Sequence, residues 1–89
     1  MPDVPEFLVE LYVPRDDSAA AARGAARARL AGEELTLEGT PVRYLRSIYV
    51  PEDETCFYLY EAPSVADVRA AARRAGFPID HICEAVEQQ

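Results

Sequence analysis

The centre of the chain reads PVRYLRSIYV over Pro41–Val50 and ETCFYLYE over Glu54–Glu61. Both segments are rich in β-branched and aromatic residues, which favour strands. Only the three residues Pro51–Asp53 separate them, and so short a connection predicts an antiparallel hairpin. The segments on either side of this hairpin then determine the fold.

A strand and a helix are predicted before the hairpin. Apolar Phe7, Val9, Leu11 and Val13 occupy every second position of Glu6–Val13, which is the period of a strand.

The alanine-rich run Ala19–Ala31 follows and predicts a helix, with N-cap residues in Asp16–Ser18. Gly24 is expected to let this helix lie close to a sheet, and a tolerated surface glycine is the alternative. Gly32 is interpreted as its C-cap, and Glu33–Gly39 as a connector that could contain one more helical turn.

A second helix and a last strand are predicted after the hairpin. Ser64 followed three residues later by Asp67 resembles a capping box, and apolar residues continue at helical spacing. Gly76 and then Pro78 end the helix. Ile79–Val86 is the last predicted strand.

The predicted order is therefore strand, helix, strand, strand, helix, strand, which defines the ferredoxin-like fold of the α+β class. We expect a four-stranded antiparallel sheet with two helices on one face. The length of 89 residues predicts a single domain over residues 1–89.

The balance of charge limits the partners that we expect. Sixteen acidic residues oppose nine basic ones, which gives a formal net charge of −7. Such a field repels phosphate backbones and anionic membranes, so neither nucleic acid nor a membrane surface is an expected partner. Met1–Glu6 lacks the basic and apolar regions of a signal peptide, and the expected location is the cytoplasm.

One face of the predicted sheet has no helix to cover it. On the interpretation that Phe57 and Leu59 face the helices, the uncovered face carries aromatic, aliphatic and acidic groups together. Such a face favours a homodimer in which two sheets enclose a cavity for a small-molecule ligand. The residues expected to line this cavity are Tyr12, Arg46, Cys56, Tyr58, Tyr60 and Glu61.

The last strand carries the best candidate metal ligands. His81, the only histidine, lies two residues before Cys83. Imidazole, thiolate and carboxylate groups bind transition metals, and the candidate ligand set is His81, Glu10, Glu84 and Cys83. No spacing typical of a zinc site is present, so an ordinary edge histidine remains an open alternative.

The strand carboxylates and the cysteines each have a second interpretation. Glu10 and Glu61 could be ligands or bases, or could pair with an arginine such as Arg43 or Arg46 across the sheet. The two cysteines, Cys56 and Cys83, are expected to be reduced thiols.

Several segments together resemble the small actinobacterial nickel-binding-protein family. They read FLVE at Phe7–Glu10, VRYLRS at Val42–Ser47, VP at Val50–Pro51, YEAP at Tyr60–Pro63 and RRAGFP at Arg73–Pro78. The resemblance extends from about Glu6 to Val86. It implies a ferredoxin-like homodimer that binds nickel without established catalysis. Glu10, Arg46 and Glu61 are motif positions, whereas Ala72 and Tyr58 depart from the family pattern, which often has His or Asn and Cys there.

Three functional hypotheses follow, and the sequence leaves open whether the protein is an enzyme. The first is a dimeric, non-catalytic protein that binds nickel. The second, by analogy with other dimeric ferredoxin-like domains, is a cofactor-free isomerase, cyclase or monooxygenase. In the second, Glu10 or His81 acts as the general base while Tyr58 and Tyr60 shape the pocket. The third and simplest is a scaffold or accessory domain without a site.

Overall fold

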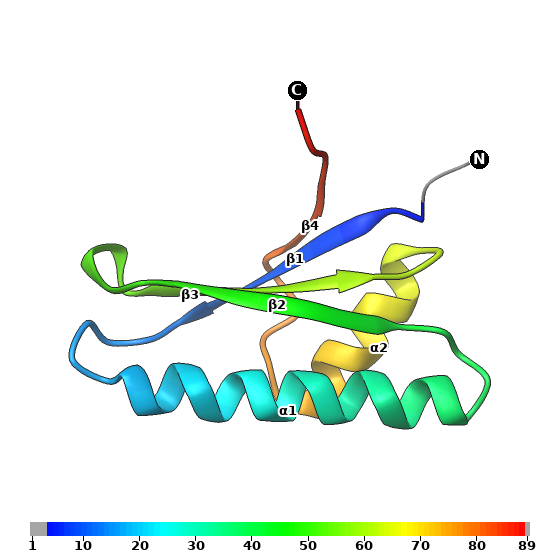
Figure 1. Cartoon of the computed structure of the whole chain (residues 1–89), viewed down its shortest axis with the longest axis horizontal. Helices are drawn as coiled ribbons and strands as arrows, with labels where there is room; N and C mark the ends of the chain where they lie inside the picture. Colours follow the sequence, from blue (N-terminus) through cyan, green and yellow to red (C-terminus); the bar gives the residue numbers. More distant parts are fainter. Residues whose placement is uncertain (1–3, 89) are drawn as a thin grey trace.

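The computed structural model describes residues 4–88 and confirms the predicted order of elements (Figure 1). Its elements are β1 (Glu6–Tyr12), α1 (Ser18–Leu37), β2 (Arg43–Val50), a 3₁₀ turn η1 (Pro51–Asp53), β3 (Thr55–Glu61), α2 (Val65–Ala75) and β4 (Ile82–Ala85). The predicted domain over residues 1–89 and the interpretation of the Met1–Glu6 segment include positions outside the described residues, and both stay predictions.

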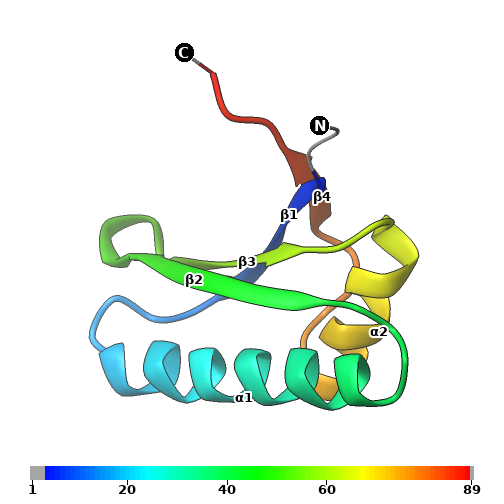
Figure 2. The same ribbon diagram turned by 45° about the vertical axis from the view of Figure 1, so that its right-hand side comes forward.

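The sheet has the strand order β2-β3-β1-β4, and every neighbouring pair is antiparallel. Both helices lie on the same side of it, as Figures 1 and 2 show from two directions. The fold is therefore ferredoxin-like, as predicted, and one sheet face lacks a helix. Within residues 4–88, no helix is long and apolar enough to cross a membrane.

The first helix is longer than predicted. It continues through Gly32 and ends at Leu37, and the backbone N–H of Glu38 caps its last carbonyls. Gly32 is buried inside the helix, where a Cβ atom would lie 3.0 Å from the carbonyl oxygen of Val42. The prediction of a C-cap at Gly32 was wrong because this glycine serves the close approach of the helix to β2.

Other boundaries follow local geometry. The side chain of Asp17 accepts a bond from the N–H of Ala20 at 3.0 Å, as expected of an N-cap. Ser64 is the N-cap of α2, but its side chain makes no capping bond, so the predicted capping box does not form. Gly76 ends that helix at φ 82°. The last strand is shorter than predicted, because β4 covers only Ile82–Ala85 of the predicted Ile79–Val86.

Two tyrosines of β3 form the centre of the core between the sheet and α1. The hydroxyl groups of Tyr58 and Tyr60 donate to the carbonyl oxygens of Ala21 and Ala28, at 3.1 and 2.6 Å. Both side chains are fully buried, and the Tyr58 ring stacks on Phe77 with centroids 4.8 Å apart. Burial raises the pKa of both phenols, so they stay protonated and able to donate.

This arrangement corrects the predicted orientation of β3. Tyr58 lies opposite Val9 and Tyr60 opposite Phe7, and paired residues of an antiparallel sheet share a face. Because Val9 and Phe7 face the helices, so do the tyrosines, and Cys56 is buried on the same side. The side chains of β3 alternate as predicted, but each set faces the side of the sheet opposite to the predicted one.

The reason lies in the face that α1 presents to the sheet. Its buried residues are Ala21, Gly24, Ala28, Ala31, Gly32 and Leu35, nearly all of them small. Such small side chains leave space between the helix backbone and β3, and large rings on the strand are needed to fill that space at native density. At Gly24 a Cβ atom would lie only 2.1 Å from the Tyr58 hydroxyl oxygen.

We therefore expect Gly24→Ala to destabilise the protein, although alanine is the better helix former by about 1 kcal/mol. Because the added Cβ atom would lie far inside van der Waals distance of the Tyr58 side chain, overpacking should cost about 2–3 kcal/mol, the upper part of the usual range. After the gain in helix propensity, the net loss in the free energy of unfolding should be about 1–2 kcal/mol. In a Tyr58→Phe background, which removes the nearest atom, the same substitution should cost less. Urea unfolding measures all four members of this cycle, and an unchanged or higher stability of Gly24→Ala contradicts the account.

An ion pair joins the ends of the two helices. The Arg74 guanidinium donates to both carboxylate oxygens of Glu38 at 2.6 and 2.9 Å and lies 3.7 Å from Glu34. These bonds hold the pKa of Glu38 below its ordinary value. A lowered carboxyl pKa stabilises the fold above the unfolded-state pKa, and this contribution is lost as the pH falls through the lower folded-state pKa.

Arg74→Gln should therefore return the pKa of Glu38 toward its ordinary value and remove that part of the acid dependence of stability. Arg73→Gln, one residue away on the same helix, is the matched control and should leave Glu38 unchanged. A carbon-detected NMR titration of the Glu38 carboxyl group measures both. An identical Glu38 titration in the parent and in Arg74→Gln contradicts the pairing.

Candidate metal centre on the open sheet face

Rows of side chains from successive strands cross the open face. One row runs from Arg46 through Leu59 and Leu8 to Cys83, and the next from Ile48 through Phe57 to Glu10. The backbone N–H of Glu10 donates to the carbonyl oxygen of His81 at 3.0 Å, which extends the β1–β4 ladder by one residue. His81 is therefore the cross-strand neighbour of Glu10 at the end of the second row.

Three of the four predicted ligands belong to this face. Strand alternation puts His81 and Cys83 on the same side, next to Glu10 and Leu8 respectively. Glu84 lies opposite Phe7, which faces the helices, and so it belongs to the other side of β4. The four ligands predicted from the sequence therefore lie on two different sides of the sheet.

The three groups are exposed and do not form a complete centre in one chain. Glu10, His81 and Cys83 are all exposed, and Cys83 is a free thiol. Among residues 4–88, no three histidine, cysteine or acidic side chains lie close enough together to hold one metal ion. The described residues of a single chain therefore do not bring together three candidate ligands.

The predicted lining of a tyrosine cavity divides in the same way. Tyr12 and Arg46 are exposed on the open face, and Glu61 lies at its rim. The Glu61 carboxylate is 3.4 Å from the Arg43 guanidinium, which is the cross-strand pairing considered from the sequence. Cys56, Tyr58 and Tyr60 lie on the helix side, so the prediction that they line this face was wrong.

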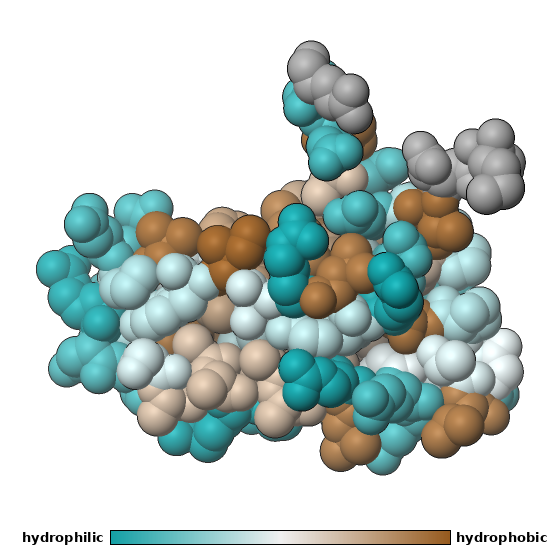
Figure 3. All heavy atoms as spheres, in the orientation of Figure 1, coloured by the Kyte–Doolittle hydropathy of each residue, from teal (hydrophilic) through white to brown (hydrophobic). Residues whose placement is uncertain are grey.

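Sequence reasoning expected apolar groups on the open face but missed three of the residues that supply them. Ile48, Phe57 and Leu59 lie there in register with Leu8 and Glu10. Ile48 is 44% exposed, although a large aliphatic side chain gains by leaving water. Figure 3 shows apolar residues interleaved with charged ones along this helix-free side. The strand register would have found these residues if β3 had been oriented correctly.

The two positions that depart from the family pattern are both internal. Ala72 and Tyr58 are fully buried in the helix-side core, and neither offers a donor to the open face. Burial likewise raises the pKa of the Cys56 thiol, which keeps it protonated and a poor metal ligand.

The protein is therefore a ferredoxin-like domain whose open sheet face carries imidazole, thiol and carboxylate groups. Residues 7–85 match the family described as nickel responsive protein SCO4226-like, and the chain belongs to that family. The resemblance noted from the sequence is thereby confirmed. Searches of curated proteins and of solved structures found no significant match.

Proposed function

We propose that the protein binds a transition-metal ion, nickel in particular, on its open sheet face and does so as a non-catalytic homodimer. The observation that carries the proposal is the adjacency of Glu10 and His81 across the β1–β4 ladder, with Cys83 on the same side. The family description, nickel responsive protein, supports nickel as the metal.

The donor types fit such an ion. Imidazole suits nickel, thiolate suits softer metals, and a carboxylate completes a borderline donor set. Glu10 and His81 would hold the ion, and Cys83 stands in the neighbouring row as a further donor. A bound ion would supply a positive charge that draws these donors together.

A second copy of the chain supplies what one copy lacks. In a two-fold dimer each protomer presents the same patch to its partner, so every donor occurs twice across the contact. The apolar side chains of Leu8, Ile48 and Phe57 surround the donors and gain from being covered. The incomplete ligand set and the uncovered apolar surface thus support the same dimer.

The cofactor-free enzyme receives no comparable support. Its pocket requires Tyr58 and Tyr60 on the open face, but both rings are packed beneath α1 with their hydroxyl groups bound to helix carbonyls. The open face keeps Glu10 and Tyr12, which alone do not enclose a substrate.

Isothermal titration with nickel tests the ligands. The parent should bind nickel, and His81→Ala should weaken binding by at least about tenfold because an imidazole donor is lost. Glu10→Gln should weaken it as well, whereas the matched control Glu52→Gln in the η1 turn should not. Affinity should fall on acidification, since ligands must be deprotonated to bind. A parent that binds no nickel, or unchanged binding by His81→Ala, refutes the proposal.

The dimer has its own test. Ile48→Glu puts a charge into the proposed contact and should convert the dimer into single chains of 9.9 kDa. Leu30→Glu, at a similarly exposed position on α1, is the matched control and should stay dimeric. Sedimentation velocity reads both. A monomeric parent, or a dimer broken only by Leu30→Glu, rules out the open face as the contact.

A further inference from the structure

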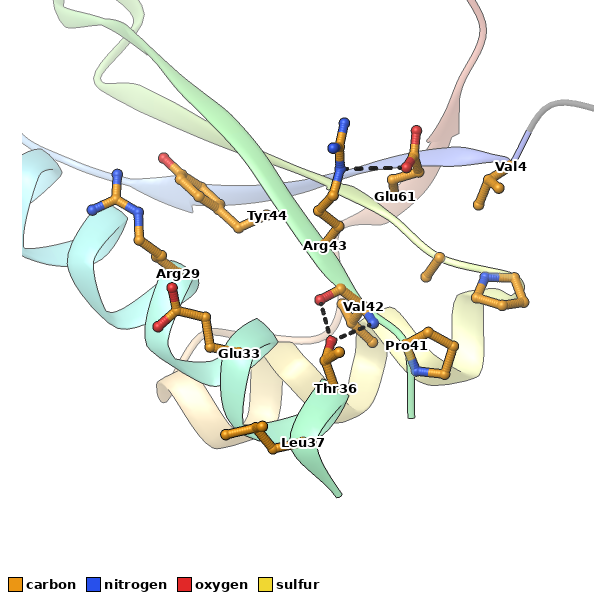
Figure 4. Close-up of a pocket in the computed structure, with 12 residues that line it drawn as sticks. Val4, Arg29, Glu33, Thr36, Leu37, Pro41, Val42, Arg43, Tyr44 and Glu61 are labelled. Carbon is orange, nitrogen blue, oxygen red and sulfur yellow. Dashed lines mark hydrogen bonds and ion pairs between the residues drawn. The ribbon is translucent and has the colours of Figure 1, made fainter. Parts of the chain in front are cut away.

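A groove of about 980 Å³ lies between the C-terminal half of α1 and the beginning of β2 (Figure 4). The end of β3 and Val4 close its far end. Its volume is in the range of small-molecule sites, roughly 300–1,000 Å³. The proposed metal ligands lie on the helix-free side of the sheet, and the groove shares with that side only the Arg43–Glu61 pair at the rim.

Most of the groove is apolar, and much of that surface is in contact with water. Leu37 on α1 is 88% exposed and Val4 is 48% exposed, and both line the groove. Pro41 and Pro63 add rigid apolar walls. A ligand with an aliphatic or aromatic body would cover surface that the chain leaves open.

The base of the groove is preformed. The Thr36 hydroxyl donates to the carbonyl oxygen of Val42 and accepts from the Val42 N–H, each at 3.1 Å. Gly32 allows the helix to approach this strand closely, as its missing Cβ atom shows. Thr36 is therefore already satisfied, and a ligand finds a fixed apolar base without rearranging the helix.

The charged groups at the mouth are of two kinds. Arg43 is paired with Glu61, so each neutralises the other. The Arg29 guanidinium lies 5.5 Å from the centre of the Tyr44 ring, and within residues 4–88 it has no carboxylate at ion-pair distance. This cation–π contact orients the guanidinium while its N–H donors stay available.

Figure 4 shows Arg29 and Tyr44 at one end of the groove and Val4 and Pro41 at the other. A cationic fork at one end and apolar walls at the other match a molecule with a carboxylate head and an apolar tail. Glu33, one turn after Arg29, also lines the groove and would repel such a head. Arg29 thus favours the binding of an anion at this end of the groove, whereas Glu33 opposes it.

We propose that this groove binds an amphipathic carboxylate, with its head on Arg29 and its apolar tail along Leu37 and Pro41. The site requires neither a metal ion nor a dimer. A test of this groove can therefore succeed or fail independently of the metal-binding proposal. The ligand class is defined by one carboxylate and an apolar body, which covers medium-chain fatty acids and aromatic acids.

Decanoate below its micelle concentration is the probe, and amide NMR shifts of the labelled full chain are the measurement. The parent should show saturable shifts confined to the groove. Arg29→Gln should weaken binding by about tenfold, and Glu33→Gln should tighten it severalfold. Arg23→Gln, an exposed α1 position outside the groove, is the matched control and should change nothing. The spectra also show that each variant is folded.

Opposite signs for the Arg29 and Glu33 variants establish both the site and the charge of its ligand. Decylammonium at equal concentration should bind more weakly than decanoate. Unsaturable shifts, shifts outside the groove, tighter binding of decylammonium or weaker binding by Glu33→Gln each overturn the proposal. Leu37→Asp supplies a final check, because unchanged decanoate affinity would mean that the tail does not lie in the groove.

Discussion

The close contact between α1 and β3 governs the rest of this structure. Two buried phenols reach across it to helix carbonyls, and each hydroxyl would carry a large desolvation cost without that partner. The contact is possible only because the helix presents alanine and glycine where the rings need space. It determines which side of the sheet is covered and therefore which side remains open.

The contact between α1 and β3 also explains which residues lie on each face of the sheet. All large rings of β3 except Phe57 serve the helix-side core, and the open side keeps the candidate metal donors together with apolar residues. The same helix continues for more than a turn beyond Gly32, and this extension forms one wall of the groove beside β2. The proposed metal site thus lies on the open face of the sheet, whereas the core and the proposed groove lie on the helix side.

The element order could be predicted because strand alternation, caps and the short hairpin turn are local signals. The orientation of β3 could not be read from its own residues, since ETCFYLYE offers large side chains on both sides. The small residues of α1 at helical spacing carried the missing information, because a flat helix face requires large partners. The role of Gly32 could not be decided from the sequence, because a helix C-cap and the close packing of a helix on a strand both favour glycine.

Part of the candidate metal site could likewise be predicted from local strand alternation. His81 and Cys83 are two residues apart and share a side, and the same rule separates Glu84 from them without any structure. The partnership of His81 with Glu10 depends on strand register, which single-sequence patterns do not give. The groove depends on where α1 ends, and the misreading of Gly32 concealed it.

Native mass spectrometry of the purified full chain with added nickel tests the central claim most directly, because one spectrum counts both chains and metal ions. The account predicts a species of two 9.9 kDa chains that carries nickel, and loss of the metal in His81→Ala. Single chains without nickel, or nickel retained equally by His81→Ala, would contradict it.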